Sequence, residues 1–427
     1  MAGPRVSNGL RTWVTRTRRS WTDLSVQERN VIYLYAMTAS FGPVQAGIGA
    51  FLTVFLVRLG ASAQQIGWLT SVPAMVSMIL IIPAGFLAER VRDQVRLRTW
   101  GSSVMRSIPL LMAVAPLIFA LSSIPNVAVG LVALQAIALA IAWPAFMTVM
   151  SDAVAPQHRS RVNGTRWALL NVVGAVLVPF FGRMLDVVEF PVNYQILFIF
   201  SFIGGIGNVY FFSRIKVRPL DVPEREPWRP SHLREGVRSY LSSIRGERKF
   251  VLFLLGTAAF RVALNMPLPL FSLYWVQELG VSDGLIGLRE TAAYVALVVG
   301  YLAWGRWSPK IQKRKQLTAG VLLLGLYLIA TGLIPSAVWL VPIALLWGLA
   351  MSGVNIGLFN IMLASAPKEK MPRVSAVLNL VASAAASVGP FLGVALSQAT
   401  SMRTALLIIG ALTILSTIPF RVVPSDV

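Results

Sequence analysis

The sequence predicts an all-α integral membrane protein in which twelve transmembrane helices form two pseudo-symmetric six-helix bundles. Composition gives the first indication. Charged residues make up 13% of the chain, whereas a soluble domain carries about 25%. Hydrophobic residues make up 56% of the chain, and the mean hydropathy is +0.69. Recurrent long apolar runs and an internal repeat are the other two indications. Most of this chain therefore cannot face water.

Each predicted helix is an apolar run of roughly 20 residues, the length that crosses a bilayer. The apolar positions cover all faces of each run, so they favour helices over a membrane barrel. The first run is too long and begins too late for a cleaved signal peptide. The predicted spans are residues 31–57, 64–88, 100–122, 126–150, 163–185, 193–213, 250–276, 284–305, 317–334, 338–363, 374–397 and 403–420.

Basic residues predict the orientation, because connectors rich in lysine and arginine stay on the cytoplasmic side. Most of the 38 lysines and arginines lie in residues 1–30 and in alternate connectors, most densely in 88–98, 214–249 and 306–315. The opposite side holds only Arg58, Arg183, Arg289 and Arg403, and Arg106, Arg166 and Arg261 fall inside spans. We therefore expect a multi-pass protein of the cytoplasmic (inner) membrane with both termini in the cytoplasm.

The longest connector divides the chain. We expect a cytoplasmic N-terminal segment over 1–30, a first six-helix bundle over 31–213, a cytoplasmic linker over 214–249, a second bundle over 250–420 and a cytoplasmic tail over 421–427. The linker ends in SHLREGVRSYLSSIRG, whose apolar positions share one helical face. This pattern predicts an amphipathic helix on the inner membrane surface, with a docking site for a partner as the alternative.

The two halves resemble each other. At a shift of 220 residues, FLTVFLVRLGASAQQIG aligns with FSLYWVQELGVSDGLIG without a gap, and Gly85 aligns with Gly305. At a shift of 211, Pro179 aligns with Pro390 and Gly182 with Gly393. Parallel halves of six helices are an architecture of transporters, whose binding site lies between the halves near the middle of the membrane.

The segment GFLAERVRDQVRLR, which begins at Gly85, carries a more specific signal. It resembles the signature G-x-x-x-D-[RK]-x-G-[RK]-[RK] that the major facilitator superfamily has between its second and third helices. Glu89 replaces the aspartate, Arg90 matches, and Arg92 stands where the second glycine would be. A degenerate copy, GRWSPKIQKRK, follows the eighth span. The resemblance covers residues 30–420 and implies the twelve-helix fold of that family; the high ratio of arginine to lysine suggests a bacterial source.

The resemblance implies a cytoplasmic gate. A glycine at position 85 would let the second helix approach a neighbour closely. Glu89 could pair with an arginine and accept hydrogen bonds from a helix N-terminus. We expect Gly85, Glu89 and Arg90, with Gly305 and Lys310 in the second half, to hold the cytoplasmic side closed. The alternative is that the arginines are only inner-leaflet anchors, which is the role we expect for Arg96 and Arg98.

A second family feature is incomplete. Many antiporters of the family carry G-x-x-x-G-P-x-x-G in the fifth helix, but here Val178 precedes Pro179. The eleventh span keeps Gly389 and Pro390. Close helix packing by small residues, with a proline kink, explains both segments equally well, so they do not indicate antiport.

The family resemblance places the substrate cavity between the first and fourth helices of each half. On the seventh span, Thr257, Arg261 and Asn265 are spaced i, i+4 and i+8 and share a face. Arg261 lies roughly 16 Å into the membrane at about 1.5 Å per residue, where a cation must meet water, a counter-ion or a substrate. Further candidates for substrate binding, each with plain packing as the alternative, are Thr38, Gln45, Trp143, Met147, Trp347, Met351 and Asn355.

Acidic residues are scarce in the spans. The candidates for coupling to a proton or another ion are Glu290, paired with Arg261 or Arg289, and Asp152, paired with Arg166. Fixed structural ion pairs are the alternative for both residues.

These observations favour a secondary transporter of a small amphipathic or anionic organic solute, working by alternating access and exporting it. The alternative is a non-transporting relative that serves as a membrane scaffold or assembly factor and docks a partner on its basic cytoplasmic face. An enzyme is not expected, because the chain has no cysteine, and both histidines, His158 and His232, lie in polar connectors. We expect no cofactor, no metal and no nucleic acid, contacts with membrane lipids, and a monomer.

Overall fold

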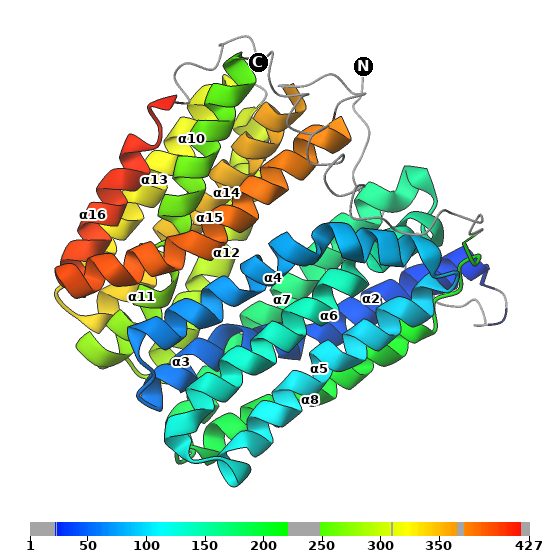
Figure 1. Ribbon diagram of the computed structural model, residues 1–427, viewed down its shortest axis with the longest axis horizontal. Helices are drawn as coiled ribbons and strands as arrows, with labels where there is room; N and C mark the ends of the chain where they lie inside the picture. Colours follow the sequence, from blue (N-terminus) through cyan, green and yellow to red (C-terminus); the bar gives the residue numbers. More distant parts are fainter. Residues whose placement is uncertain (1–21, 23, 221–247, 309–310, 365–370, 420–427) are drawn as a thin grey trace, which may run out of the picture.

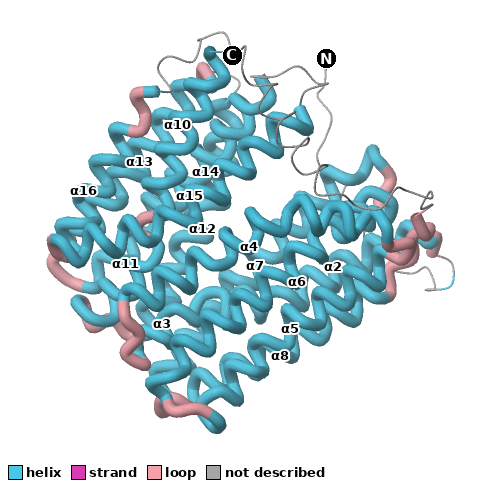
Figure 2. Tube along the Cα trace, viewed as in Figure 1, coloured by secondary structure: helices cyan, strands magenta, loops and turns pink. Residues whose placement is uncertain are grey.

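The computed structural model describes residues 22, 24–220, 248–308, 311–364 and 371–419, and within this part of the chain all regular structure is helical (Figure 2). The linker helix predicted over residues 231–246, the N-terminal segment up to residue 21, and Lys310 lie outside the described residues. Two groups of helices pack side by side (Figure 1).

The first group follows the first six predicted spans in order. Its helices are α2 (Val26–Val44), η2 (Gln45–Gly49), α3 (Ala50–Arg58), α4 (Ala63–Arg90), α5 (Gln94–Ile118), η3 (Leu121–Ser123), α6 (Ile124–Ala153), η4 (Pro156–His158), α7 (Arg159–Val187) and α8 (Val192–Ser213). Helix α2 packs against α7 and α8, and α6 packs against α4 and α5.

The second group follows the remaining predicted spans. Its helices are α10 (Arg248–Asn265), α11 (Leu268–Leu273), η5 (Tyr274–Glu278), α12 (Asp283–Trp307), α13 (Lys313–Leu333), η7 (Ala337–Trp339), α14 (Leu340–Ala364), α15 (Met371–Ala399) and α16 (Met402–Leu415). Helix α14 packs against α12 and α13, and α10 packs against α15.

Ten of these segments are long and apolar enough to cross a membrane, and the bent helix α4 would make eleven. The last helix, Met402–Leu415, is apolar but shorter. The predicted helical segments are thus all present in order, while the count of twelve full spans is not reached by length and composition alone.

Three spans contain breaks that the hydropathy pattern did not predict. The first span has a π-helical stretch at Gln45–Gly49, just after Pro43. The seventh is interrupted between Asn265 and Leu268, because Pro267 has no amide hydrogen to continue the ladder. In α4, the parts Ala63–Leu80 and Pro83–Arg90 are bent by 59° around Pro83.

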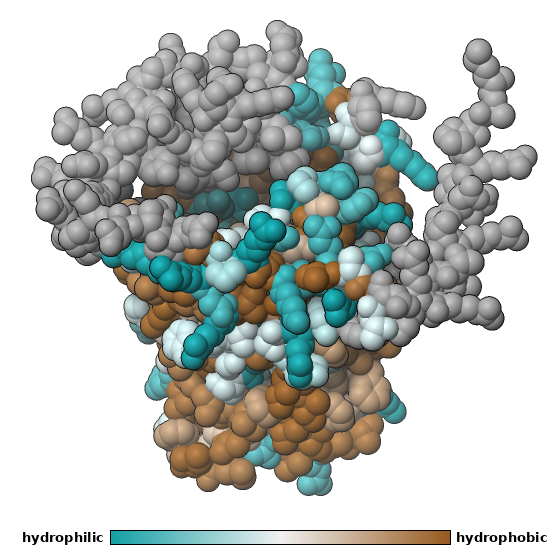
Figure 3. Space-filling model, turned by 90° about the vertical axis from the view of Figure 1, so that its right-hand side faces the viewer, coloured by the Kyte–Doolittle hydropathy of each residue, from teal (hydrophilic) through white to brown (hydrophobic). Residues whose placement is uncertain are grey.

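The two groups meet at one end and diverge at the other (Figure 1). We call the end that carries Arg58 and Asp283 the closed end; there, α3 and α4 contact α11, α7 packs against α12, and α4 packs against α15. We call the opposite end, where α2, α5 and α10 begin, the divergent end. Hydrophilic side chains gather on the divergent end of the first group above an apolar flank (Figure 3).

A single apolar core joins the groups near the closed end. Phe55 lies between Tyr194 and Phe198, with ring centroids 4.8 and 5.3 Å away, and all three side chains are fully buried. The same cluster includes Tyr274 and Trp275 from the second group. Aromatic side chains bury large areas of apolar surface, so this core favours keeping the closed end together.

Candidate functional site

An ion pair between the two groups fastens the closed end. Arg58, the last residue of α3, lies 2.8 Å (Nη2) and 3.0 Å (Nε) from Oδ1 of Asp283, the first residue of α12. Arg58 Nη2 also donates to the carbonyl oxygen of Val281 at 2.9 Å. The Asp283 side chain is only 5% exposed, so its charge depends on this partner. The sequence placed Arg58 in an outer connector but did not predict its acidic partner.

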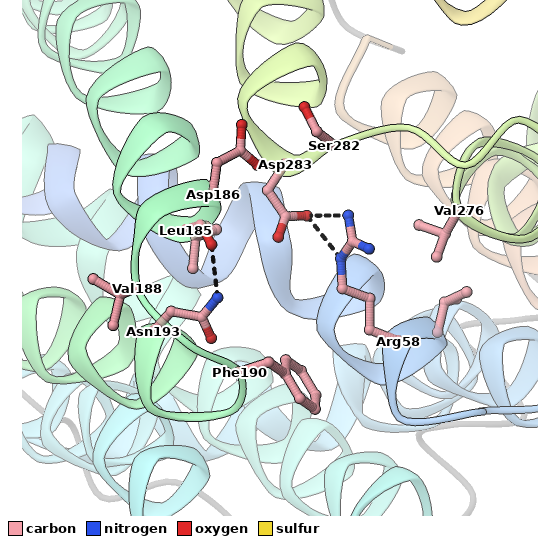
Figure 4. Close-up of a pocket in the computed structure, with 10 residues that line it drawn as sticks. Arg58, Leu185, Asp186, Val188, Phe190, Asn193, Val276, Ser282 and Asp283 are labelled. Carbon is pink, nitrogen blue, oxygen red and sulfur yellow. Dashed lines mark hydrogen bonds and ion pairs between the residues drawn. The ribbon is translucent and has the colours of Figure 1, made fainter.

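A second contact crosses the junction beside the ion pair. The backbone amide of Gly284 donates to Asp186 Oδ2 at 3.1 Å, which joins the start of α12 to the end of α7. Figure 4 shows the Asp283 carboxylate directed at Arg58, with Asp186 on the opposite side of Asp283. These residues line a cavity of about 510 Å³ together with Phe190 and Asn193.

Glycines let helices cross closely, both between the two groups and within the second group. A Cβ built on Gly182 of α7 would lie 2.8 Å from the carbonyl oxygen of Asp283, and one on Gly287 of α12 would lie 3.0 Å from that of Val178. In α15, a Cβ on Gly389 would lie 2.8 Å from Cβ of Asn265, and one on Gly393 would collide with the carbonyl oxygen of Met266. The glycines of the two incomplete antiporter-type segments therefore serve close packing, which the sequence left open.

Arg261 on α10 has a buried nitrogen atom that forms no hydrogen bond with any residue that the structure describes. Its side chain is half-buried, and its Nε atom is buried without a partner. The neighbouring Thr257 is also buried, and its Oγ1 has no partner. The Asn265 amide donates to the Arg261 carbonyl oxygen at 2.6 Å. Because the Nε atom is buried, an external anion can reach Arg261 only through the exposed part of its side chain.

Glu290 pairs with Arg289 and not with Arg261. Arg289 Nη1 lies 2.5 Å from Glu290 Oε1, and Arg289 Nη2 donates to the Tyr327 hydroxyl at 2.7 Å. The Arg289 guanidinium also lies 4.8 Å from the Trp275 ring centroid. Arg289 is 5% exposed, so it lies in the protein interior, and its predicted position on the outer side of the membrane stays a prediction. Ser282 caps α12 at its start, which places Arg289 nearly two turns inside the helix.

Arg98, Arg106 and Arg166 in the helices of the first group are buried or half-buried. Arg98 and Arg106 of α5 are 8% and 6% exposed, so the prediction of Arg98 as a surface anchor was wrong. Arg106 Nε donates to Asn208 Oδ1 at 3.2 Å, and its guanidinium lies 4.3 Å from the Phe41 ring centroid. Arg166 of α7 donates to Thr38 and not to Asp152, which is exposed at the end of α6. The predicted Asp152–Arg166 pair is therefore absent.

The remaining predicted cavity residues fall into two kinds of surroundings. Trp143 and Met147 on α6 are about half exposed, at 49% and 46%. Asn355 on α14 is exposed and donates to the Tyr301 hydroxyl at 2.9 Å. The others are more enclosed: Thr38 is buried, Gln45 is half-buried and interacts with Tyr294 of α12, and Trp347 and Met351 pack against the main core.

The predicted gate residues lie at the divergent end. A Cβ built on Gly85 or on Gly305 would meet nothing within 4 Å, so the close helix approach expected at Gly85 is not made in this structure. Glu89 and Arg90 are exposed at the end of α4. The bend in α4 and the divergence of the two groups account for the open space around Gly85.

The comparison with protein families agrees with this architecture. The family model described as Major Facilitator Superfamily matches residues 32–271 and 253–426, which together cover most of the chain. The chain belongs to the Major Facilitator Superfamily. It is a multi-pass membrane protein of a transporter family, with the all-helical fold that the sequence predicted.

Solved structures of several transporters have the same fold. A mutant of the nucleoside transporter NupG is 11% identical, with a TM-score of 0.69, and the match covers 93% of this chain and 99% of that one. A POT family transporter in complex with a thioalcohol-conjugated peptide is 13% identical, with a TM-score of 0.71 over 91% and 94%. A bacterial homologue of the human lysosomal transporter Spinster, inward-facing and unoccupied, is 14% identical, with a TM-score of 0.64 over 93% and 97%.

One curated relative is similar in sequence. The multi-drug resistance efflux pump PmrA homologue of Lactococcus lactis subsp. lactis (strain IL1403) is 28% identical over 160 residues. The match covers 36% of this chain and 39% of the length of that relative.

Proposed function

We propose that this protein is a secondary transporter that exports a small amphipathic or anionic organic solute across the cytoplasmic membrane by alternating access. The observation that carries the proposal is the asymmetry between its two ends. An ion pair and an aromatic core join the groups at the closed end, while the groups diverge at the basic, divergent end. Because basic connectors stay in the cytoplasm, this arrangement corresponds to a state open toward the cytoplasm.

The family assignment favours transport over a scaffold or an enzyme. One of the similar solved structures is named as a nucleoside transporter, and another is a POT family transporter in complex with a conjugated peptide. Both names agree with an organic solute. The name of the Lactococcus relative supports efflux. The half-buried Arg261, which has no carboxylate partner among the described ion pairs, supports an anionic group on the solute.

A reversible lock at the closed end tests the proposal. Because the native chain has no cysteine, Arg58→Cys with Asp283→Cys can be bridged selectively by a short bifunctional thiol reagent with a reducible link. Uptake of a panel of labelled amphipathic anions, cations and neutral compounds into proteoliposomes is then measured. We expect the unlocked protein to transport an anion, the bridged protein to be inactive, and reduction to restore transport.

The double-cysteine variant treated with a monofunctional thiol reagent is the matched control and should keep its activity, because it lacks the same two charges but carries no bridge. Transport that continues in the fully bridged protein would contradict alternating access at this junction. Failure of the native protein to move any member of the panel above the rate of empty liposomes would reject the transporter itself.

A further inference from the structure

The first group of helices contains a buried cluster of positive charge that the proposed transport site does not use. It consists of Arg98 on α5 and Arg166 on α7, which lie around Phe146 of α6. Arg98 is 8% exposed and Arg166 is half-buried. Neither guanidinium forms an ion pair with any carboxylate in the described part of the chain.

The two guanidiniums share one aromatic ring. Their Cζ atoms lie 5.1 Å (Arg98) and 5.2 Å (Arg166) from the Phe146 ring centroid. Arg166 also donates from Nε to Thr38 Oγ1 at 2.9 Å, and its Nη1 lies 3.6 Å from Met150 Sδ. An arginine has five N–H donors, so one hydroxyl and one thioether leave most of the Arg166 donors available.

Arg98 has fewer hydrogen-bond partners than Arg166 among the described residues. Its Nη1 atom is buried and has no hydrogen-bond partner among the residues that the structure describes. The charge of Arg166 is close enough to act on Arg98, so the pair is mutually repulsive. The nearest acidic residue on its own helix, Asp93, accepts a hydrogen bond from the Arg96 amide as the N-cap of α5. Asp152, at the end of α6, is exposed.

A bound anion would give Arg98 Nη1 a hydrogen-bond acceptor and would offset the repulsion between Arg98 and Arg166. A carboxylate, sulfonate or phosphate offers several acceptor oxygens, and arginine is suited to binding such groups in a bidentate manner. The Phe146 ring and the Met150 thioether add an apolar, polarizable surface for the body of such a molecule. The third arginine, Arg106, already has Asn208 and Phe41 as partners and does not need a ligand.

We infer that Arg98, Arg166 and Thr38, with Phe146 and Met150 beside them, form an oxyanion-binding site that holds the anionic group of an amphipathic organic molecule in the first bundle. This inference rests on the proposed transport function and makes its substrate class an organic anion. The site lies on the opposite bundle from Arg261. An anionic lipid headgroup carries the same oxyanion chemistry and is a second source of the ligand.

Binding of two matched naphthalene compounds tests the site. The purified full-length protein in phosphatidylcholine nanodiscs is titrated calorimetrically with naphthalene-2-sulfonate and with the neutral naphthalene-2-methanol. We expect the sulfonate to bind more tightly, and Arg98→Gln and Arg166→Gln each to weaken it by roughly tenfold, as expected for the loss of a charge-assisted hydrogen bond. Arg96→Gln, which removes an exposed cation from the same end of α5, should bind like the native protein.

If Arg98→Gln does not fold, Arg166→Gln still tests the site, because Arg166 is only half-buried. Melting curves show whether each variant is folded. Equal binding of the sulfonate and the neutral compound, or native affinity in folded Arg166→Gln, would overturn the site. Competition by phosphatidylglycerol in the nanodiscs, seen in the native protein but not in Arg166→Gln, would identify the lipid headgroup as the ligand.

The transport assay separates this inference from the proposed function. Sulfonate binding that depends on Arg98 and Arg166 in a protein that transports nothing would keep the site and reject transport. Organic-anion transport at the native rate in both variants would keep the transporter and reject the site.

Discussion

Arg289 and Glu290 depend on each other although they are consecutive residues of one helix. Side chains at consecutive helical positions normally point in different directions, yet here the Arg289 guanidinium reaches both Glu290 and the Tyr327 hydroxyl. Removing a charged partner from a buried pair strands the other charge, which costs more than removing both charges together. Arg261 has no carboxylate partner among the described ion pairs, so its removal strands nothing.

This difference gives a prediction at the residue scale. Arg289→Met should destabilise the protein by about 2 kcal/mol, because Glu290, whose side chain is 22% exposed, loses its partner and Tyr327 loses a hydrogen-bond donor. Arg289→Met combined with Glu290→Gln should recover a large part of that loss. Arg261→Met should leave the melting temperature near that of the native protein while reducing transport of organic anions. Thermal unfolding in detergent measures the first two effects, and a strongly destabilised Arg261→Met would contradict the assignment of partners.

The sequence predicted the existence of buried cations but only some of their positions. Arg261 could be placed within a span because it lies far from both ends of a long apolar run. Arg98 and Arg289 lie near the ends of their helices, where counting charges assigns them to the membrane surface. Their burial depends on Phe146, Tyr327 and other side chains on different helices, which the local sequence does not specify.

At the scale of elements, pairs of glycines determine how closely the two bundles meet. Gly182 and Gly287 bring α7 and α12 together at the closed end. Gly67 on α4 lies against α15, where a Cβ would be 3.4 Å from Val394. Gly67 and Gly287, which the internal repeat aligns with each other, therefore both lie where helices of the two groups cross. Because a side chain is absent at these positions, backbone atoms can approach closely across the junction.

Gly182→Ala should disturb this crossing, whereas Gly174→Ala on the same helix should not. The new Cβ at position 182 would lie 2.8 Å from the Asp283 carbonyl oxygen, so α12 would have to move. At position 174 the Cβ would meet nothing within 4 Å, and replacing a helical glycine should be neutral or stabilising by up to about 1 kcal/mol. Melting temperatures of the two purified variants measure the difference. Equal melting temperatures would show that the crossing tolerates the shift.

Helix positions were easier to predict than helix irregularities. Each predicted span has a helical counterpart because long apolar runs fix where the chain can cross a membrane. The π-helical stretch at Gln45–Gly49 is different, since Gly47 there faces Ser201 and Leu197 of α8. Such a local change depends on packing between helices and leaves no clear trace in hydropathy.

At the scale of the whole molecule, the sequence predicted a latch at one end and the structure has its contacts at the other. The superfamily signature directed attention to Gly85, Glu89 and Arg90. Arg58 and Asp283 are 225 positions apart, and the internal repeat does not align them with each other. A transporter that alternates must exchange one set of contacts for the other. One structure holds one of these sets, so the latch at Gly85 stays a prediction for the opposite state.

Weakening the closed end should therefore shift the whole molecule toward that opposite state. Asp283→Asn preserves the shape of the side chain but removes the charge that holds Arg58. Arg58 is 28% exposed beside a cavity, so it can be hydrated when the ends separate. Two pairs of spin labels report the change: Glu189→Cys with Ser336→Cys at the closed end, and Gln157→Cys with Gln312→Cys at the divergent end. These residues are all exposed.

We expect Asp283→Asn to lengthen the distance across the closed end and to shorten the distance across the divergent end, because a rocking motion couples the two. Glu278→Gln is the matched control, since Glu278 lies 3.8 Å from Arg403 within the second group and does not cross the junction. Its distances should match those of the native protein. If both distances in Asp283→Asn stay unchanged, the aromatic core of Phe55, Tyr194 and Tyr274 holds the closed end without help from the ion pair. If only the closed end lengthens, the two ends are not mechanically coupled.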